Sequence, residues 1–279
     1  MLAKSWLFGL ISAAALAAGT AWAVTGPDSL WQNHVVDPKR AAEITDAHLF
    51  HWDEQPSSDK TAVICVHGWY PDGEPSRETA SKVFLPAIVE FANCANQKAD
   101  RPFAYYLFTY NPDLDPREAA ERLCALIEGD KHLTQAKSRF ILSGHSFGGW
   151  VVQCYVAKFG RRKVLGRPSN GTPWHGVVWA DKQQLREALS KIYPHLVDAI
   201  MAQIDKKVDF ESGSLRWMRP GNPERQKMLA AGALDSTCFL YVGTTSEMPT
   251  KSLARYTTPL LLFDAWGWKT DSITSNLAY

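Results

Sequence analysis

Three times between residues 61 and 159, a short strand-like segment leads through a loop into a segment with a helical pattern. The strand-like segments are Thr61–Val66, Phe103–Tyr110 and Arg139–Ser143, and the helical patterns lie at about 77–92, 117–127 and 147–159, the first of them amphipathic. Runs rich in β-branched and aromatic residues are typical of buried strands, and the longer patterns are typical of helices. The alternation indicates right-handed βαβ crossovers, and therefore an α/β domain with a mostly parallel sheet. Two more strands are expected, a weak one around His48–Trp52 and another at Phe239–Val242.

This alternation is interrupted after Gly176, where the pattern from about residue 181 to 210 is helical. Apolar residues recur there at every fourth position, namely Ile192, Leu196, Ile200, Ile204 and Val208. One interpretation is a helix that packs this stripe on the sheet. The other is a mobile helical cap over an active site, inserted at about residues 177–235.

The segment GHSFG at 144–148 has the pattern G-x-S-x-G, and its surroundings make the pattern informative. A strand-like run precedes it and a helical pattern follows it, which is the strand–turn–helix setting of a nucleophile elbow. Glycines on both sides relieve the crowding of so tight a turn. The start of a helix also directs N–H groups and a partial positive charge toward an oxyanion. We therefore predict that Ser146 is a nucleophile, with an ordinary glycine-rich turn as the alternative.

Another strand-like run ends in His67-Gly68-Trp69. Acyl transfer needs two donors placed where the tetrahedral oxygen will sit, and losing one typically costs about 3 kcal/mol. The expected pair is the N–H of Phe147, which follows the nucleophile, and the N–H of Trp69. Gly68 lets the backbone come close, and His67 is predicted to brace the loop by hydrogen bonding rather than to act as a base. We expect His67, Gly68 and His145 to contribute to the binding site.

Together with GTPWHG at 171–176, these two motifs resemble those of bacterial lipases and related lipase-like esterases, which are α/β-hydrolases. The resemblance covers about Thr61–Gly176. It implies an α/β-hydrolase fold, with a mostly parallel sheet flanked by helices and a helical cap at about 177–235. It departs from the family at Trp174, because the family places histidine directly after proline. His175 is therefore expected to be structural.

The family order of catalytic residues is serine, acid and histidine. The segment TDSIT at 270–274 is similar to the lipase segment N-D-G-x-V that carries the catalytic aspartate, although it lacks the glycine. The resemblance thus implies Asp271 as the acid. Asp264 is a competitor for this role, and Asp235 is a more distant one.

The catalytic histidine is an open question, because all eight histidines lie at or before His195. Without a base, Ser146 keeps its proton and only residual catalysis would remain. Three interpretations compete. The chain lacks a C-terminal tail that carries the base, an upstream residue such as His175 or His195 supplies it, or the protein is a non-catalytic relative.

The first 23 residues have the features of a secretory signal peptide. Lys4 supplies a positive charge, Trp6–Ala18 is largely apolar, and AWA at 21–23 has the small-x-small pattern that signal peptidase recognises. We expect a secreted or periplasmic protein that begins near Val24, with a hydrolase domain at 24–279. An uncleaved N-terminal anchor is the alternative.

An exported chain meets an oxidising environment, so its five cysteines need an account. Cys65 and Cys154 lie in apolar runs and are predicted to be buried. Cys94, Cys124 and Cys238 follow no metal-ligand spacing, and their spacing does not identify the partners of a disulfide.

The net charge is +1 with no long run of one sign, which argues against a nucleic-acid-binding surface. The predicted activity is hydrolysis of a small-molecule or lipid ester through an acyl-enzyme, without a metal or organic cofactor. A transient contact of the cap with a lipid surface belongs to this expectation. The alternatives are a thioesterase or peptidase that uses the same serine, and a binding protein that keeps the fold without catalysis.

Overall fold

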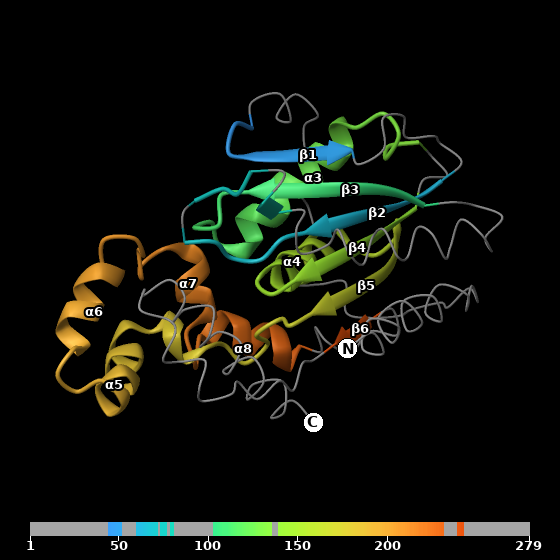
Figure 1. Cartoon of the computed structure of the whole chain (residues 1–279). Helices are drawn as coiled ribbons and strands as arrows, with labels where there is room; N and C mark the ends of the chain where they lie inside the picture. Colours follow the sequence, from blue (N-terminus) through green and yellow to red (C-terminus); the bar gives the residue numbers. More distant parts are fainter. Residues whose placement is uncertain are drawn as a thin grey trace, which may run out of the picture.

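The computed structural model describes residues 44–51, 60–71, 73–76, 79–80, 103–135, 139–231 and 239–242. Within them, one six-stranded sheet has the order β1-β3-β2-β4-β5-β6 (Figure 1). The strands are β1 (Ala47–His51), β2 (Thr61–Val66), β3 (Phe103–Tyr110), β4 (Phe140–His145), β5 (Val164–Asn170) and β6 (Phe239–Val242). Only β1 runs antiparallel to its neighbour, and the other described pairs are parallel. The predicted, mostly parallel sheet is thus confirmed, with an antiparallel strand at one edge.

Strands β2 and β3 are apolar along almost their whole length because both faces of the sheet are covered. All residues of β3 after Phe103 are buried, and the last three residues of β2 are buried as well. The register sets the end of β2 beside the end of β4, with Val66 opposite Gly144. The segments that follow these two strands therefore begin next to one another.

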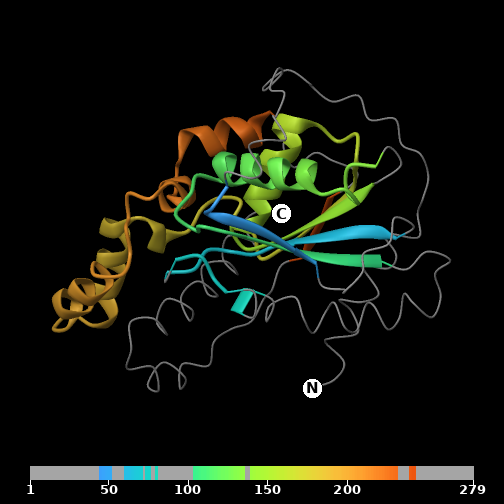
Figure 2. The same ribbon diagram turned by 90° about the horizontal axis from the view of Figure 1, so that it is seen from above.

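The helices are α3 (Pro116–Gly129), α4 (Gly148–Phe159), the short 3-10 helix η2 (Val178–Ala180), α5 (Lys182–Ile192), α6 (Val197–Ile204), α7 (Gly213–Met218) and α8 (Pro223–Ala230). Helices α3, α4 and α8 lie on one face of the sheet (Figure 2). On the other face, Ala80 packs against Cys65, Tyr105 and Leu107. The helix predicted at 77–92 lies outside the described residues except for parts of its beginning, where Thr79 and Ala80 are helical.

Local sequence explains where α3 begins. Asp115 accepts a hydrogen bond from the backbone N–H of Arg117, and Glu118 completes a capping box by bonding the N–H of Asp115. Pro116 occupies the first turn, where its missing N–H costs nothing. Helix α3 then packs beside α4 and supports the helix behind the predicted nucleophile.

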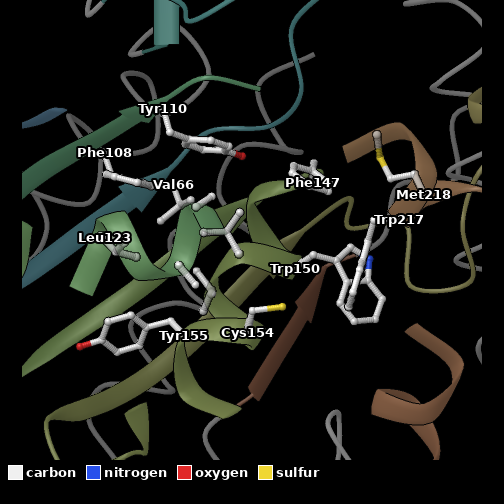
Figure 3. Packing of buried hydrophobic residues seen from close by; sticks show 14 of the residues in the cluster. Val66, Phe108, Tyr110, Leu123, Phe147, Trp150, Cys154, Tyr155, Trp217 and Met218 are labelled. Carbon is white, nitrogen blue, oxygen red and sulfur yellow. The ribbon is translucent and has the colours of Figure 1, made fainter. Parts of the chain in front are cut away.

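A cluster of buried tryptophans joins α4 to the base of the insertion (Figure 3). The ring of Trp150 on α4 lies 4.7 Å from that of Trp174 and 5.5 Å from that of Trp217 on α7. Its Nε1 donates a hydrogen bond of 3.0 Å to the carbonyl of Pro173, so its polar atom is satisfied in the core. The start and the end of the insertion are therefore packed on the same helix.

The insertion consists of several short helices, and the interpretation as one helix with a single stripe on the sheet is wrong. Helix α5 ends at Ile192 and α6 begins at Val197, because Pro194 between them interrupts the helical pattern. At this break the side chains of Ile192 and Leu196 are 48% and 57% exposed, whereas Ile204 is buried. Figure 1 shows α5 and α6 beyond the carboxyl ends of β2, β4 and β5.

Cys65 and Cys154 are buried, as predicted, and Cys124 is buried too; all three are free thiols. Cys94 and Cys238 lie outside the described residues, as do the predicted signal peptide and Asp271. No helix in the described part of the chain is both long and apolar enough to cross a bilayer.

Candidate active site

The strand order places a topological switch point between β2 and β4. From β2 the chain crosses to β3 on one side, and from β4 it crosses to β5 on the other side. The loops that follow β2 and β4 therefore diverge, and a crevice outside the carboxyl ends at such a point is where α/β proteins bind ligands. The HGW segment directly follows β2, and the GHSFG segment begins in the last two residues of β4, so both lie at this position.

Ser146 is the only described non-glycine residue with a positive φ, at 51°. It lies between the end of β4 at His145 and the start of α4 at Gly148, with Phe147 as the N-cap of the helix. Ser146 is partly exposed, whereas Phe147 and Gly148 are buried. This is the strained strand–turn–helix geometry of a nucleophile elbow, which lifts the serine hydroxyl above the sheet.

The glycines around Ser146 are required by close contacts between backbone segments. A Cβ on Gly148 would lie 2.3 Å from the carbonyl oxygen of Val66 and 2.4 Å from that of His67. A Cβ on Gly144 would lie 2.6 Å from the Cα of Gly149. The elbow is thus pressed against the end of β2 and against its own helix, at distances that only glycine permits.

Gly68 brings the second loop against Ser146. A Cβ on Gly68 would lie 2.8 Å from the Cβ of Ser146 and 3.2 Å from the carbonyl oxygen of His145. The structure therefore brings together the two motifs that the sequence predicted to form one site. The N–H of Trp69, one residue further on, belongs to the backbone segment that touches the elbow.

His67 is fully buried and braces this loop through both ring nitrogens. The N–H of Tyr110 donates to Nε2 over 3.1 Å, so Nδ1 carries the proton that bonds the carbonyl of Gly68 at 2.5 Å. The hydroxyl of Tyr110 donates to the carbonyl of His67 over 2.9 Å, and the two rings stack at 4.3 Å. Burial lowers the pKa of His67 to about 4, so the ring is neutral. These bonds leave His67 no nitrogen with which to receive a proton from Ser146.

The far end of the same loop is attached to the sheet through Glu74. Its Oε1 accepts a hydrogen bond of 2.7 Å from the hydroxyl of Thr109 and lies 2.9 Å from Nδ1 of His48. The loop after β2 is thus held at its beginning by His67 and near its end by Glu74. Sequence reasoning missed Glu74, because nothing in a glycine- and proline-rich loop indicates which strand its carboxylate reaches.

The remaining described histidines do not complete a catalytic pair with Ser146. In the described part of the chain, the hydroxyl of Ser146 makes no hydrogen bond, and so it has none to a described histidine. Burial lowers the pKa of His145 to about 4. His175 and His195, the two upstream candidates for the base, are both exposed, the latter in the connection between α5 and α6.

The segment after β5 packs behind the elbow. A Cβ on Gly149 would lie 1.9 Å from Oγ1 of Thr172, and that hydroxyl bonds the hydroxyl of Ser169 at 2.5 Å. Thr172 therefore helps to fix the first turn of α4. Its position in the GTPWHG motif is a sequence signal for such a role.

Arg225 is a second residue that sequence reasoning missed. Its guanidinium is buried and donates to the carbonyl oxygens of Trp217 and His175, the latter over 2.8 Å. The N–H of Val177 also donates to the carbonyl of Met218 over 2.8 Å. These bonds tie the start of the insertion to its end. An arginine on a polar helix carries no sequence signal for such a position.

Asp271, the predicted catalytic acid, lies outside the described residues, as do its competitors Asp264 and Asp235. Among the residues that the structure does describe, no group of three or more His, Cys, Asp or Glu side chains could hold a metal ion.

Comparison with known proteins gives structural neighbours only. No protein-family model and no curated protein matches the sequence. The fold is similar to that of a mature lipase from Bacillus licheniformis, with a TM-score of 0.47 and 17% identity over 79% of this chain and 80% of the lipase. It is also similar to phospholipase PlaB from Legionella pneumophila, with a TM-score of 0.44 and 16% identity over 67% of this chain and 40% of PlaB. A thermophilic esterase from Thermogutta terrifontis gives a TM-score of 0.37 and 12% identity over 70% of this chain and 84% of the esterase.

The arrangement within the chain itself identifies the fold. A mostly parallel sheet carries the serine elbow on the strand next to its switch point, a glycine loop from the neighbouring strand touches the serine, and a helical insertion follows the next strand. The chain has an α/β-hydrolase fold.

Proposed function

We propose that this chain is a serine hydrolase that cleaves carboxylic esters, with Ser146 as the nucleophile. The observation that carries the proposal is the elbow itself, in which Ser146 has a φ of 51° and Gly68 of the second loop lies against its Cβ. A strained serine costs stability, on the order of 1–3 kcal/mol, and such strain concentrates at sites where it serves a mechanism.

In the proposed reaction, Oγ of Ser146 attacks the ester carbonyl, the alcohol leaves, and water then releases the acyl group. The N–H groups of Phe147 and Trp69 would hold the oxyanion in both steps. Phe147 caps the start of α4, where N–H groups lack intrahelical partners and the helix dipole favours negative charge. Trp69 follows the glycine that contacts the nucleophile.

The attack also needs a base to take the hydroxyl proton. We propose Asp271 as the acid that orients this base, as the resemblance to lipases implies. The described histidines form no hydrogen bond with Ser146, so the base itself is unassigned. This observation favours a second candidate function, a binding protein that keeps the site and holds esters without turning them over.

Labelling with a fluorophosphonate tests the proposal, because it measures the nucleophilicity of one serine directly. We expect covalent label on Ser146, mapped by mass spectrometry, and Ser146-dependent hydrolysis of p-nitrophenyl esters. Ser146→Ala should remove both. Label on a different serine would refute the assignment of the nucleophile. Ester binding without either reaction would support the binding protein instead. A parallel assay with thioesters and peptides determines whether the leaving group is an alcohol, a thiol or an amine.

A further inference from the structure

Two tryptophan side chains to which the proposed reaction gives no role, those of Trp69 and Trp179, meet beside Ser146. Trp69 directly follows Gly68, whose added Cβ would lie 2.8 Å from the Cβ of Ser146. The indole of Trp69 lies 5.4 Å from that of Trp179, with the ring planes at 42°. Both side chains are only partly buried. The pair therefore offers an apolar, partly exposed surface that begins one residue along the chain from Gly68, the residue in contact with Ser146.

The two rings come from parts of the chain that are far apart in sequence. Trp69 belongs to the loop after β2, whereas Trp179 lies on η2, the first helical turn of the insertion. The insertion extends beyond the carboxyl ends of the strands, at the edge of the sheet where Ser146 lies (Figure 1). Trp179 thus faces the nucleophile loop from the insertion side of the site.

Trp179 is held firmly in this position. On one side, the N–H of Val177 donates to the carbonyl of Met218 over 2.8 Å, and on the other side the neighbouring Ala180 is fully buried. The buried guanidinium of Arg225 donates to the carbonyl of His175 just before this turn. Because the backbone around Trp179 is already fixed, ligand binding does not have to order it, and less conformational entropy is lost on binding.

We infer that Trp69 and Trp179 form the surface that binds the apolar part of the substrate, so that the chain selects esters with long alkyl groups over acetate esters of short alcohols. This inference rests on the proposed function of Ser146. Each methylene group removed from water contributes to binding, whereas a methyl acetate has too little apolar surface to cover two indoles. A charged acyl group would lose its hydration against the same surface.

The test compares methyl octanoate, octyl acetate and methyl acetate as substrates, with ester cleavage followed by pH-stat titration. In the unmodified chain we expect the larger kcat/KM for an octyl-containing ester. The two octyl esters reveal whether the indoles contact the acyl or the alcohol side. Trp179→Ala should lower the kcat/KM ratio of the preferred octyl ester to methyl acetate by about tenfold, which corresponds to lost contact with roughly two methylene groups. Trp179→Phe should give a smaller decrease, and it serves as the test if the alanine variant does not fold.

Phe159→Ala is a matched control. Phe159 is also partly buried and packs on one aromatic ring, that of Tyr155 at 5.3 Å, but it lies at the end of α4 opposite to Ser146. This variant should leave the ratio unchanged. An unchanged ratio in both Trp179 variants would overturn the inference while leaving the proposed function intact. If no ester is cleaved and no fluorophosphonate labels Ser146, the proposed function fails and the inference fails with it.

Discussion

Replacing Gly148 by alanine tests whether contact between the elbow and the loop after β2 sets the geometry of the site. The added Cβ would lie 2.3 Å from the carbonyl oxygen of Val66, whereas real Cβ atoms essentially never come within 3.0 Å of a neighbour. The obstructing atom belongs to the backbone, so no side-chain rotation relieves the overlap. The two segments must separate by about 0.7 Å, the difference between these two distances.

Two free energies of opposite sign decide the effect on stability. Overpacking of a tight contact costs about 1–3 kcal/mol, while alanine in place of glycine in a helix interior gains up to about 1 kcal/mol. Gly148 is the first residue of α4, so the gain is smaller there. We expect a net loss of about 1–2 kcal/mol in the free energy of unfolding. The same movement separates Ser146 from the Trp69 N–H, and a misplacement near 1 Å can cost up to about 100-fold in rate.

Urea denaturation and the rate of fluorophosphonate labelling of Ser146 measure the two effects separately. Gly213→Ala is the control, because its Cβ would meet the backbone nitrogen of Asp115 at 2.4 Å, a comparable overlap between α7 and the N-cap of α3. We expect the control to lose similar stability and to keep the labelling rate of the folded protein. If Gly148→Ala is as stable and as reactive as the unmodified chain, the reasoning from backbone contact is refuted.

Two further predictions concern buried polar groups. In the folded chain, His67 and His145 have pKa values of about 4, below the usual 6.5. Between pH 4 and pH 6.5 the unfolded chain therefore binds more protons than the folded chain, so the free energy of unfolding falls as the pH falls. Urea denaturation at pH 7 and pH 5 should show a loss of about 2 kcal/mol for each histidine, and equal stability at both pH values would contradict the lowered pKa values of these rings. Arg225→Met should lower the free energy of unfolding by about 2–4 kcal/mol, because the carbonyls of His175 and Trp217 lose their donors. An Arg225→Met variant that unfolds at the same urea concentration as the unmodified chain would contradict this role.

The elements next to Ser146 were predictable because each has a strong local signal. A β-branched run such as that of β2 and the glycines at 144 and 148 reflect constraints that act within a few residues. The pairing of the HGW loop with the elbow was predictable too, because both motifs end strands of one parallel sheet and the carboxyl ends of such strands meet at one edge.

The insertion was harder to predict because the four-residue spacing of its apolar residues continues across the point where one helix ends and the next begins. Ile192 and Leu196 are four residues apart, so they continue the stripe in the sequence although Pro194 separates two helices between them. The contacts of Arg225, 50 residues from His175, depend on how the insertion returns to the core. Such long-range contacts leave no pattern in a single sequence.

The proposed mechanism assigns the stabilisation of the oxyanion to the N–H groups of Phe147 and Trp69, and it leaves the transfer of the serine proton unassigned. These two contributions differ greatly in size. An oxyanion site and binding alone leave about 10³–10⁴-fold catalysis over water when triad members are removed, far below the rate of a complete triad. The absolute rate of ester cleavage at Ser146 therefore shows whether a base acts on the serine, whereas the mere detection of activity does not. A rate only about 10³–10⁴-fold above that in water means that no base reaches Oγ of Ser146. A rate several orders of magnitude higher requires a base, and since His67 uses both ring nitrogens to hold the loop, that base must come from another residue.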